Sequence, residues 1–231
     1  MPRTGRPREF ERDAALDAAM RLFWAHGYEA TSLDRLRTAM GGLSSASFYA
    51  AFRSKEQLFR EAVRRYLDTH GRAVASLYDV SLPPREAIER ALLASARMQT
   101  DESHPQGCMI VMSTATIAPD NTHLQTLLAA ERAANRAAIA ACIRRGIDDG
   151  ELAPDIDSDS TAALFEALLV GLSTQARDGV PAAHIEGAIA GVMSVWDSLR
   201  RADPSRAPRT RQHRNRPAVG TGSAGRMDDG R

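Results

Sequence analysis

Hydrogen-bond donors gather in one short stretch of the sequence, between residues 44 and 55. They include Ser44, Ser45, Ser47, Tyr49 and Lys55. Hydroxyl and ammonium groups donate readily to phosphate oxygens and to the base edges of a nucleic acid. Lys55 stands out because it is the only lysine of the chain, beside 29 arginines. A compact ammonium suits one phosphate oxygen, whereas a guanidinium is a planar fork.

Motifs for catalysis or metal binding are missing from the sequence. It contains no nucleophile elbow, no phosphate-binding glycine loop and no zinc-binding HExxH stretch. The two cysteines, Cys108 and Cys142, show no CxxC or Cys/His spacing and are interpreted as reduced thiols. We therefore expect a protein that is not an enzyme and that holds no metal and no cofactor. Four histidines are interpreted as surface or loop residues, which are His70, His104, His123 and His184.

The elements that must position these donors are helices. Apolar residues recur at every third or fourth position, and glycines and prolines fall mostly between such segments. The sequence predicts an all-α fold. A first helix is expected over residues 10–26, with a buried face that includes Leu16, Ala19 and Phe23, and Gly27 suits its C-terminal cap.

Two shorter helices should follow. Thr31 is the expected N-cap of the first, because Thr31-Ser32-Leu33-Asp34 has the pattern of a capping box. Gly41-Gly42 ends that helix, and Ser44 caps the next one. Two short helices joined by a glycine turn, and braced by a longer one, form the unit whose last helix enters a DNA major groove. A purely structural helical hairpin is the alternative.

Residues 8–66 resemble the TetR family of repressors. The resemblance is carried by four segments in the family's order, which are Thr31-Ser32-Leu33, Gly42-Leu43-Ser44, Ser47-Phe48-Tyr49-Ala50-Ala51-Phe52 and Ser54-Lys55-Glu56-Gln57-Leu58-Phe59. It implies an N-terminal helix-turn-helix domain, followed by a helical domain that binds a ligand and dimerises. It also implies a homodimer that represses transcription from an inverted-repeat DNA operator until a small-molecule effector releases it.

The sequence departs from the family's pattern at two places. Gly41-Gly42 stands where the family usually has a single glycine, which could tilt the recognition helix. Ala50-Ala51 replaces the polar or aromatic pair that commonly follows the tyrosine, so that a phosphate contact of other members is missing here.

The DNA-binding candidates fall into two groups. Thr31, Tyr49 and Lys55 are expected at phosphates, with Lys55 at the family's phosphate-binding position. Base edges are assigned to Ser45, Ala46 and Ser47, and Arg35 and Arg37 could reach neighbouring groups. Ser44 is a candidate too, although capping alone explains it, and Phe48 and Phe52 are expected in the core. The arginines of the N-terminal arm could lie in the minor groove, and they are Arg3, Arg6 and Arg8.

The chain divides into three predicted parts. Residues 1–53 form the DNA-binding domain with its arm, residues 54–201 form the ligand-binding and dimerisation domain, and residues 202–231 form a disordered tail rich in Arg, Pro and Gly. Within the second part we expect helices over residues 54–77, 84–100, 121–149, 160–177 and 181–201. The tail carries seven arginines against three acids. It is either simply solvated or a further contact to DNA that is blind to sequence.

The last two expected helices are apolar on more than one side. One side can pack on the helices of the same chain and the other on a second copy, where small residues allow close approach. The alternative is that both sides are buried within one chain. The residues assigned to the dimer interface are Phe165, Leu168, Gly171, Leu172, Gly187, Gly191, Val192 and Trp196.

An effector pocket is expected around Cys108, Met109, Met112 and Phe165, which would suit an apolar molecule. The opposing interpretation is that this stretch is ordinary core. Cys108 also raises an alternative function, in which its thiol senses oxidants or electrophiles. Burial beside Met109 and Ile110 would instead make it inert.

The formal net charge is only +1, so DNA binding must come from a local surface and not from the overall charge. No window contains the roughly 18 apolar residues that a bilayer-spanning helix needs. The N-terminus is basic but has no apolar segment of a secretory signal after it. We expect a cytoplasmic protein without a membrane partner.

Overall fold

The computed structural model describes the backbone of residues 6–200 and the side chains of residues 12–200. Arg3 of the predicted arm and the predicted tail therefore lie outside the described residues, as do the side chains of Arg6 and Arg8.

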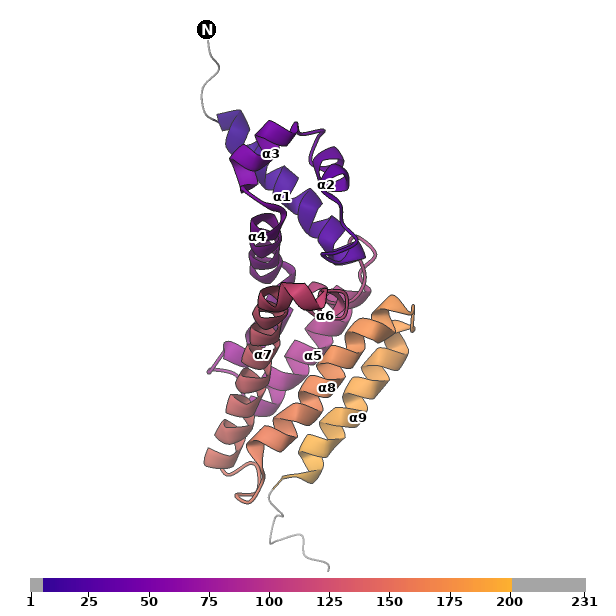
Figure 1. Ribbon diagram of the computed structural model, residues 1–231. Helices are drawn as coiled ribbons and strands as arrows, with labels where there is room; N and C mark the ends of the chain where they lie inside the picture. Colours follow the sequence, from indigo (N-terminus) through magenta and orange to yellow (C-terminus); the bar gives the residue numbers. More distant parts are fainter. Residues whose placement is uncertain (1–5, 201–231) are drawn as a thin grey trace, which may run out of the picture. The chain divides into compact units, whose positions relative to one another are not determined.

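The described part of the chain is helical throughout, which confirms the predicted fold class. It contains no strand, and its only extended pairing is an isolated bridge between Leu152 and Arg200. The first three helices form a unit that we call the head (Figure 1), and they are α1 (Arg6–His26), α2 (Leu33–Ala39) and α3 (Ser45–Phe52).

Local signals set the ends of the head's helices. Gly27, directly after α1, has a φ of 77°, and the turn between α2 and α3 contains Gly41 and Gly42 at φ angles of 87° and 73°. A residue with a Cβ would be strained at such angles. Ser44 caps α3, because its hydroxyl accepts the backbone N–H of Ser47 at 3.1 Å.

The predicted N-cap of α2 is wrong by one residue. Ser32 is the cap, and its hydroxyl accepts the N–H of Arg35 at 3.2 Å. Thr31 is completely buried, and its hydroxyl donates to the carbonyl of Gly27 at 2.7 Å. Thr31 therefore closes the turn after α1 instead of starting α2.

The helix predicted over residues 54–77 is also interrupted. It is divided into α4 (Lys55–Asp68) and a 3₁₀ segment, η1 (His70–Tyr78). Thr69 leaves the helical region, with φ of −116° and ψ of −88°, and Gly71 follows it. Glycine has a low helix propensity, so the chain continues as a tighter 3₁₀ coil and not as an α-helix.

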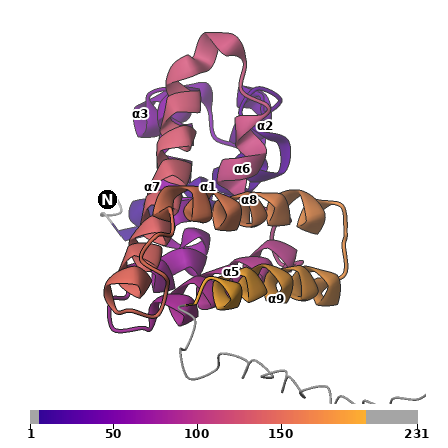
Figure 2. The same ribbon diagram turned by 90° about the horizontal axis from the view of Figure 1, so that it is seen from below.

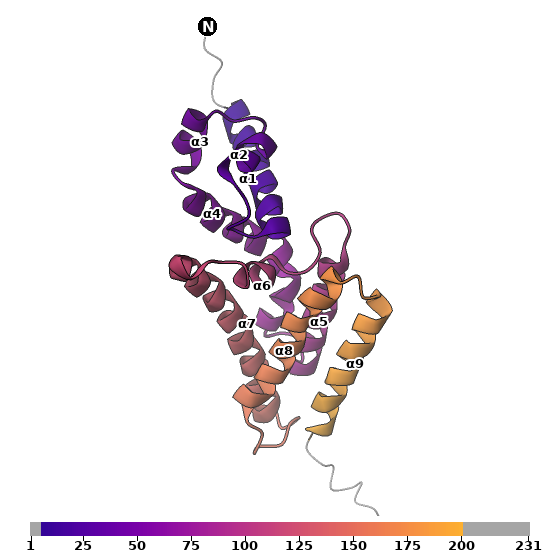
Figure 3. The same ribbon diagram turned by 45° about the vertical axis from the view of Figure 1, so that its right-hand side comes forward.

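The remaining helices form a second unit, which we call the body. They are α5 (Pro84–Thr100), α6 (Met109–Thr114), η2 (Pro119–Asn121), α7 (Thr122–Asp148), α8 (Ser158–Arg177) and α9 (Ala182–Ser198), as in Figure 1. Of these, α5, α7, α8 and α9 lie close to the predicted ranges. Helices α8 and α9 run side by side in every view (Figure 2). The short α6 lies where the body meets the head (Figure 3).

Two hydrophobic clusters stabilise these helices. One combines the apolar faces of α1–α4 with residues of the body, which are Met109, Ile110, Ile117, Leu124 and Leu128. The other fills the body between α5, α7, α8 and α9, around Ile88, Phe165 and Trp196. The head therefore shares its core with α6 and the start of α7.

None of the helices among residues 6–200 has both the length and the apolar character required to span a bilayer.

Candidate functional site

Helix α3 presents one polar face, and the residues that orient it are buried. Phe48 and Phe52 are 0% and 1% exposed, which confirms their predicted place in the core. Between them Tyr49 is 50% exposed. Also exposed are Ser44, Ser45, Ala46 and Ser47 at the start of this helix, and Ala50 and Ala51 near its end. The structure thus brings together five of the predicted DNA-binding residues on one surface.

The serines of this surface differ in what their hydroxyls can do. Ser44 accepts the N–H of Ser47 and donates its own hydroxyl hydrogen to Ser47 Oγ at 3.0 Å. The hydroxyl of Ser44 is therefore fully engaged in capping the helix, as the sequence indicated. The Ser47 hydroxyl keeps its hydrogen for an outside acceptor, and Ser45 is exposed beside it.

Lys55 is the first residue of α4 and lies over an aromatic ring. Its Nζ is 4.3 Å from the centroid of Tyr28. Burial lowers the pKa of the Lys55 ammonium from its ordinary value, while the carboxylate of Glu29 acts in the opposite direction. The cation is thus held by the ring and by Glu29 beside the start of a helix, where backbone N–H groups also attract anions.

The two arginines of α2 have different surroundings. Arg35 is exposed, and its Nη2 lies 3.1 Å from Nε2 of His26. Arg37 donates from Nε to the carbonyl of Leu43 at 2.8 Å and from Nη1 to Asp34 at 3.1 Å. Arg37 therefore braces the turn between α2 and α3, which leaves Arg35 as the better placed of the two for an outside ligand.

Thr31 does not belong to this surface, although the sequence placed it at a phosphate. Its side chain is 0% exposed and its hydroxyl hydrogen is donated to Gly27. A buried hydroxyl with its hydrogen engaged has nothing to offer a phosphate. This assignment is corrected to a structural role.

A second feature is a cavity of about 70 Å³ inside the body. Its walls come from α4, η1, α5, α6, α7 and α8, and the apolar ones include Leu67, Val74, Met98, Val111 and Leu169. Of the four predicted pocket residues, only Cys108 lines it. Met109 and Phe165 are completely buried in the two cores, and Met112 lies outside the lining. The pocket prediction is therefore wrong for these three residues.

Polar groups also reach this cavity. Gln99 is 2% exposed, and its side-chain carbonyl accepts the hydroxyl of Ser173 at 2.8 Å, so its amide N–H₂ is the end left for a ligand. Tyr66 donates its hydroxyl to Cys108 Sγ at 3.2 Å. Burial, together with Cys108, raises the pKa of Tyr66 well above its ordinary value, so the phenol stays protonated and remains a donor.

The other cysteine has no such access. Cys142 is 1% exposed, and burial raises the pKa of its thiol. A buried thiol with a raised pKa is a poor nucleophile. Cys142 is therefore a core residue.

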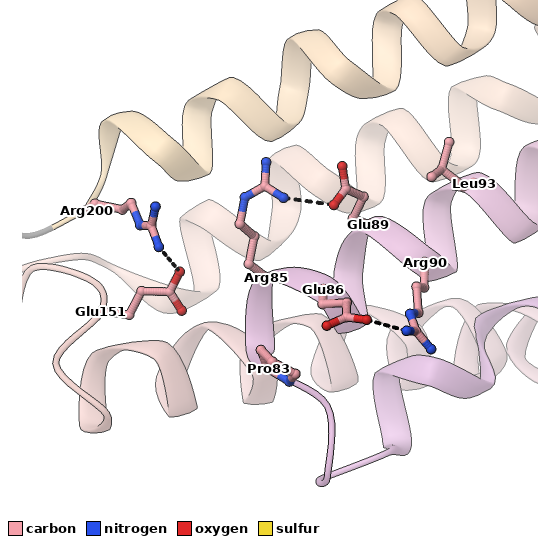
Figure 4. A pocket seen from close by; sticks show the side chains of 8 residues that line it. All are labelled: Pro83, Arg85, Glu86, Glu89, Arg90, Leu93, Glu151 and Arg200. Atoms are coloured by element: carbon pink, nitrogen blue, oxygen red, sulfur yellow. Dashed lines mark hydrogen bonds and ion pairs between the residues drawn. The ribbon is translucent and has the colours of Figure 1, made fainter.

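A larger open basin of about 550 Å³ lies at the opposite end of α5 (Figure 4). Its arginines are paired with its own carboxylates. Arg85 pairs with Glu89 at 2.8 Å, Arg200 pairs with Glu151 at 3.2 Å, and Arg90 pairs with Glu86. With its charges satisfied internally, this basin offers a charged ligand little.

The outer faces of α8 and α9 carry the predicted dimer contacts, in part. Gly171, Gly187 and Gly191 are open, because a Cβ at any of them would meet nothing within 4 Å. Leu168 and Val192 are half-buried, whereas three other assigned residues are completely buried within the chain, namely Phe165, Leu172 and Trp196. These three belong to the core of the body and not to an exposed face.

Sequence reasoning missed an aromatic cluster between head and body. Trp24 of α1 stacks on His104, and both rings contact His70. His104 lies in a loop, as expected, but it is only 9% exposed. Trp24, His70 and His104 come from segments that are far apart in the sequence, so no local pattern could have revealed the cluster.

Comparison with known proteins identifies the family. The model of "Bacterial regulatory proteins, tetR family" matches residues 15–62, and "Tetracyclin repressor-like, C-terminal domain" matches residues 86–192. The HTH-type transcriptional repressor ComR of Escherichia coli (strain K12) is 32% identical over 196 residues, which cover 84% of this chain and 93% of ComR.

Solved structures agree with this assignment. The TetR family transcriptional regulator CifR, in a cysteine-substituted form complexed with 26-base-pair operator DNA, shares 36% identity at a TM-score of 0.76, covering 85% of this chain and 99% of that one. A TetR transcriptional regulator from Chloroflexus aurantiacus shares 25% identity at a TM-score of 0.74, with coverage of 85% and 99%. The chain described here therefore belongs to the TetR family of bacterial regulatory proteins.

Proposed function

We propose that this protein is a transcriptional repressor that binds an inverted-repeat operator as a homodimer and leaves it when a small molecule enters the body. The observation that carries the proposal is the exposed face of α3, where Ser45, Ser47 and Tyr49 stand on a helix fixed by two buried phenylalanines. A helix face of this kind fits a DNA major groove, and the resemblance to the TetR family indicates that DNA is the partner. We infer a cytoplasmic location, because a bacterial regulator of this kind acts on DNA in the cytoplasm.

Each contact has a proposed role on the DNA. Lys55 and Tyr49 bind phosphates and set the register, whereas Ser45, Ala46 and Ser47 face base edges. Arg35 reaches a neighbouring group, and Ser44 contributes by fixing the start of the helix. The operator-bound structure of CifR, a relative at 36% identity, supports operator DNA as the partner.

The dimer is proposed to form through the open faces of α8 and α9. Small residues dominate these faces, and Leu164 is 44% exposed among them. Gly187 and Gly191 lie one helical turn apart, and the space at both is free. Backbones can therefore approach closely there, and a two-fold pair would present two equivalent α3 helices to an inverted repeat.

The proposed domain boundaries near residues 53 and 201 separate the DNA-binding part of the chain from the part that binds the ligand and dimerises. Helix α4 links the two parts. Tyr66, Leu67 and His70, from α4 and the start of η1, line the cavity, and Lys55 begins the same α4. A ligand that requires a different position of α4 would favour a conformation that fits the operator poorly. A coupling of about 1–3 kcal/mol changes affinity by roughly 5- to 150-fold.

The proposal is tested by footprinting the DNA upstream of the protein's own gene. The expected result is protection of a two-fold symmetric site that survives excess unrelated DNA. Protection of no site, or a footprint equal on all sequences, would remove the repressor assignment.

A second candidate function is favoured by the size of the cavity and by Cys108 on its wall. An engineered cavity of about 150 Å³ holds benzene, so the smaller space seen here holds only a few heavy atoms. Since non-covalent ligands gain at most about 1.5 kcal/mol per heavy atom, so small a molecule binds weakly. Either the cavity widens around a larger apolar effector, or a small reactive one forms a covalent bond.

From the protein, the covalent route needs only the Cys108 thiol and the Tyr66 hydroxyl, and the effector supplies the electrophilic carbon. Cys108 Sγ attacks the electron-poor carbon of an electrophilic alkene, a C–S bond forms, and the π electrons move to the neighbouring carbon, which takes up the proton lost by the thiol. The Tyr66 hydroxyl, 3.2 Å from the sulfur, stabilises the developing thiolate. Oxidation by peroxide would instead convert the thiol to a sulfenic acid and release water.

The two routes are separated by adding N-ethylmaleimide or hydrogen peroxide to the operator complex. If Cys108 is the sensor, the native protein and the control Cys142→Ser lose affinity, while Cys108→Ser keeps it. Equal behaviour of all three proteins would leave reversible binding of an apolar effector as the route to release.

A further inference from the structure

Two histidine rings lie against a tryptophan at the junction of head and body. The ring of His104 stacks on Trp24 with centroids 4.5 Å apart and planes at 23°. The ring of His70 meets the same indole edge-on at 4.9 Å and lies 4.6 Å from His104. Tyr66 completes the group, 4.9 Å from Trp24. We call these four residues the Trp24 cluster.

The Trp24 cluster joins elements of both units. Trp24 belongs to α1 of the head, and it donates its indole N–H to the carbonyl of Gly107 at 2.9 Å. His70 begins η1, and His104 lies in the loop between α5 and α6. Since His70 and Tyr66 also line the cavity, the cluster touches the proposed effector site on one side and the head on the other.

Both rings can be neutral in this arrangement. Nδ1 of His104 lies 3.1 Å from the carbonyl oxygen of Pro105. A carbonyl only accepts, so Nδ1 carries the hydrogen, which leaves Nε2 bare in the neutral ring. Burial lowers the pKa of His70, and both His104 and Arg21 act in the same direction.

Charged groups near His70 act in opposite directions on its protonation. The cation of Arg21, on α1, opposes a further positive charge. Asp101 at the end of α5 and Asp17 on α1 favour one. Asp17 is already bound by Arg65 at 2.8 Å, and Asp101 accepts the N–H of Ser103 at 2.8 Å. Cys108, directly before α6, adjoins the cluster through its hydrogen bond with the Tyr66 hydroxyl.

We propose that His70 and His104 form a proton-sensitive joint, which holds the head on the body while the rings are neutral and loosens it when both are protonated. The first proton is tolerated, because an imidazolium can stack on an indole face. The second places two cations 4.6 Å apart beside Arg21, where the nearby carboxylates of Asp17 and Asp101 are already engaged in hydrogen bonds. Acid would thereby act as a regulator in addition to the effector.

The sign of this effect distinguishes it from ordinary electrostatics. Acidification makes any protein more positive and should strengthen its binding to phosphates. If the joint loosens in acid, binding to the operator should become weaker instead. Operator affinity should fall by about tenfold between about pH 7.5 and about pH 5.5 at constant ionic strength.

Variants locate the effect. His104→Phe keeps a ring on Trp24 but cannot be protonated, so its affinity should not fall on acidification. His123→Gln is the matched control, because His123 links the body to α4, through Glu56 at 3.2 Å, and it should retain the loss. Should His104→Phe be unfolded, His70→Gln carries the same expectation. An acid loss that persists in the folded variant, or native affinity that rises in acid, overturns the proposal.

A measurement without DNA keeps this test independent of the proposed repressor function. Because the pKa of His70 is lowered on folding, the unfolded chain binds its proton first, and stability is lost as the pH falls below about 6.5. The thermal midpoint of the native protein should therefore fall more steeply in acid than that of His70→Gln or His104→Phe. Parallel curves for native protein and variants would reject the joint, whatever the operator assay shows.

Discussion

The ammonium of Lys55 lies 4.3 Å from the ring centroid of Tyr28, so the one lysine of the chain is held in place before any ligand arrives. An ordered side chain loses less entropy when it binds. The relationship explains how the half-buried Lys55 at the start of α4 could serve as a fixed contact to a phosphate.

Replacement of Lys55 should therefore weaken DNA binding without changing its sequence preference. Lys55→Ala is expected to lower affinity about equally on operator and on unrelated DNA, and to reduce the salt slope by about one. Ser47→Ala is the matched comparison, since it should mainly alter base preference. Titrations at several salt concentrations check both, and a sequence-selective effect of Lys55→Ala would contradict the assigned role.

Tyr49 offers a finer test because its ring and its hydroxyl have separate tasks. The ring packs edge-on against Phe48 at 5.4 Å between centroids, while the side chain is 50% exposed. Tyr49→Phe keeps the packing and removes only the donor. Affinity for the operator should drop by roughly the worth of one hydrogen bond to a charged group, about 1.5–3 kcal/mol, with unchanged thermal stability. Unaltered affinity would assign Tyr49 to packing alone.

Thr31 should matter for stability and not for DNA contact. Thr31→Val keeps the shape of the side chain but leaves the carbonyl of Gly27 without its 2.7 Å partner. The free energy of unfolding is expected to fall by about 1–3 kcal/mol. Denaturant titration measures this loss. Operator binding well below the unfolding transition should be unaffected, and a large loss of affinity in the folded variant would return Thr31 to the DNA surface.

The dimer interface can be tested at its open glycines. Glutamate at Gly187 or Gly191 would place a charge where backbones are proposed to meet, and sedimentation should then show monomers. Ala133→Glu, on the exposed side of α7, is the matched control and should remain a dimer. A native protein that is monomeric at micromolar concentration would be incompatible with the proposed interface.

The sequence specified the head accurately because its signals are local. Ser44 caps α3 as expected, and Gly41 and Gly42 adopt the positive φ angles that a tight turn needs. The one capping error, at Thr31, arose between adjacent residues that can both cap. Only the packing of Thr31 under α1 decides for Ser32.

Features that depend on contacts between distant parts of the chain could not be predicted from such local signals. Phe165, Leu172 and Trp196 lie on helices that are apolar on more than one side, and sequence alone does not say which side faces the chain's own core. The cavity likewise combines residues from six elements. Met109 follows Cys108 directly, yet it is completely buried in the cluster shared with α1–α4 and does not line the cavity, a distinction that local sequence does not reveal.

The core shared by head and body bears on how this protein could be recombined with its relatives. Met109, Ile117 and Leu128 pack in the same apolar cluster as α1–α4. A chimaera joined between α3 and α4 would therefore combine the head of one parent with core residues of the other parent, which pack against a different head. Exchanging α1–α4 together with residues 109–128 would carry the whole cluster across intact. New operator specificities are thus more easily built by changing the exposed side of α3 than by transplanting the domain.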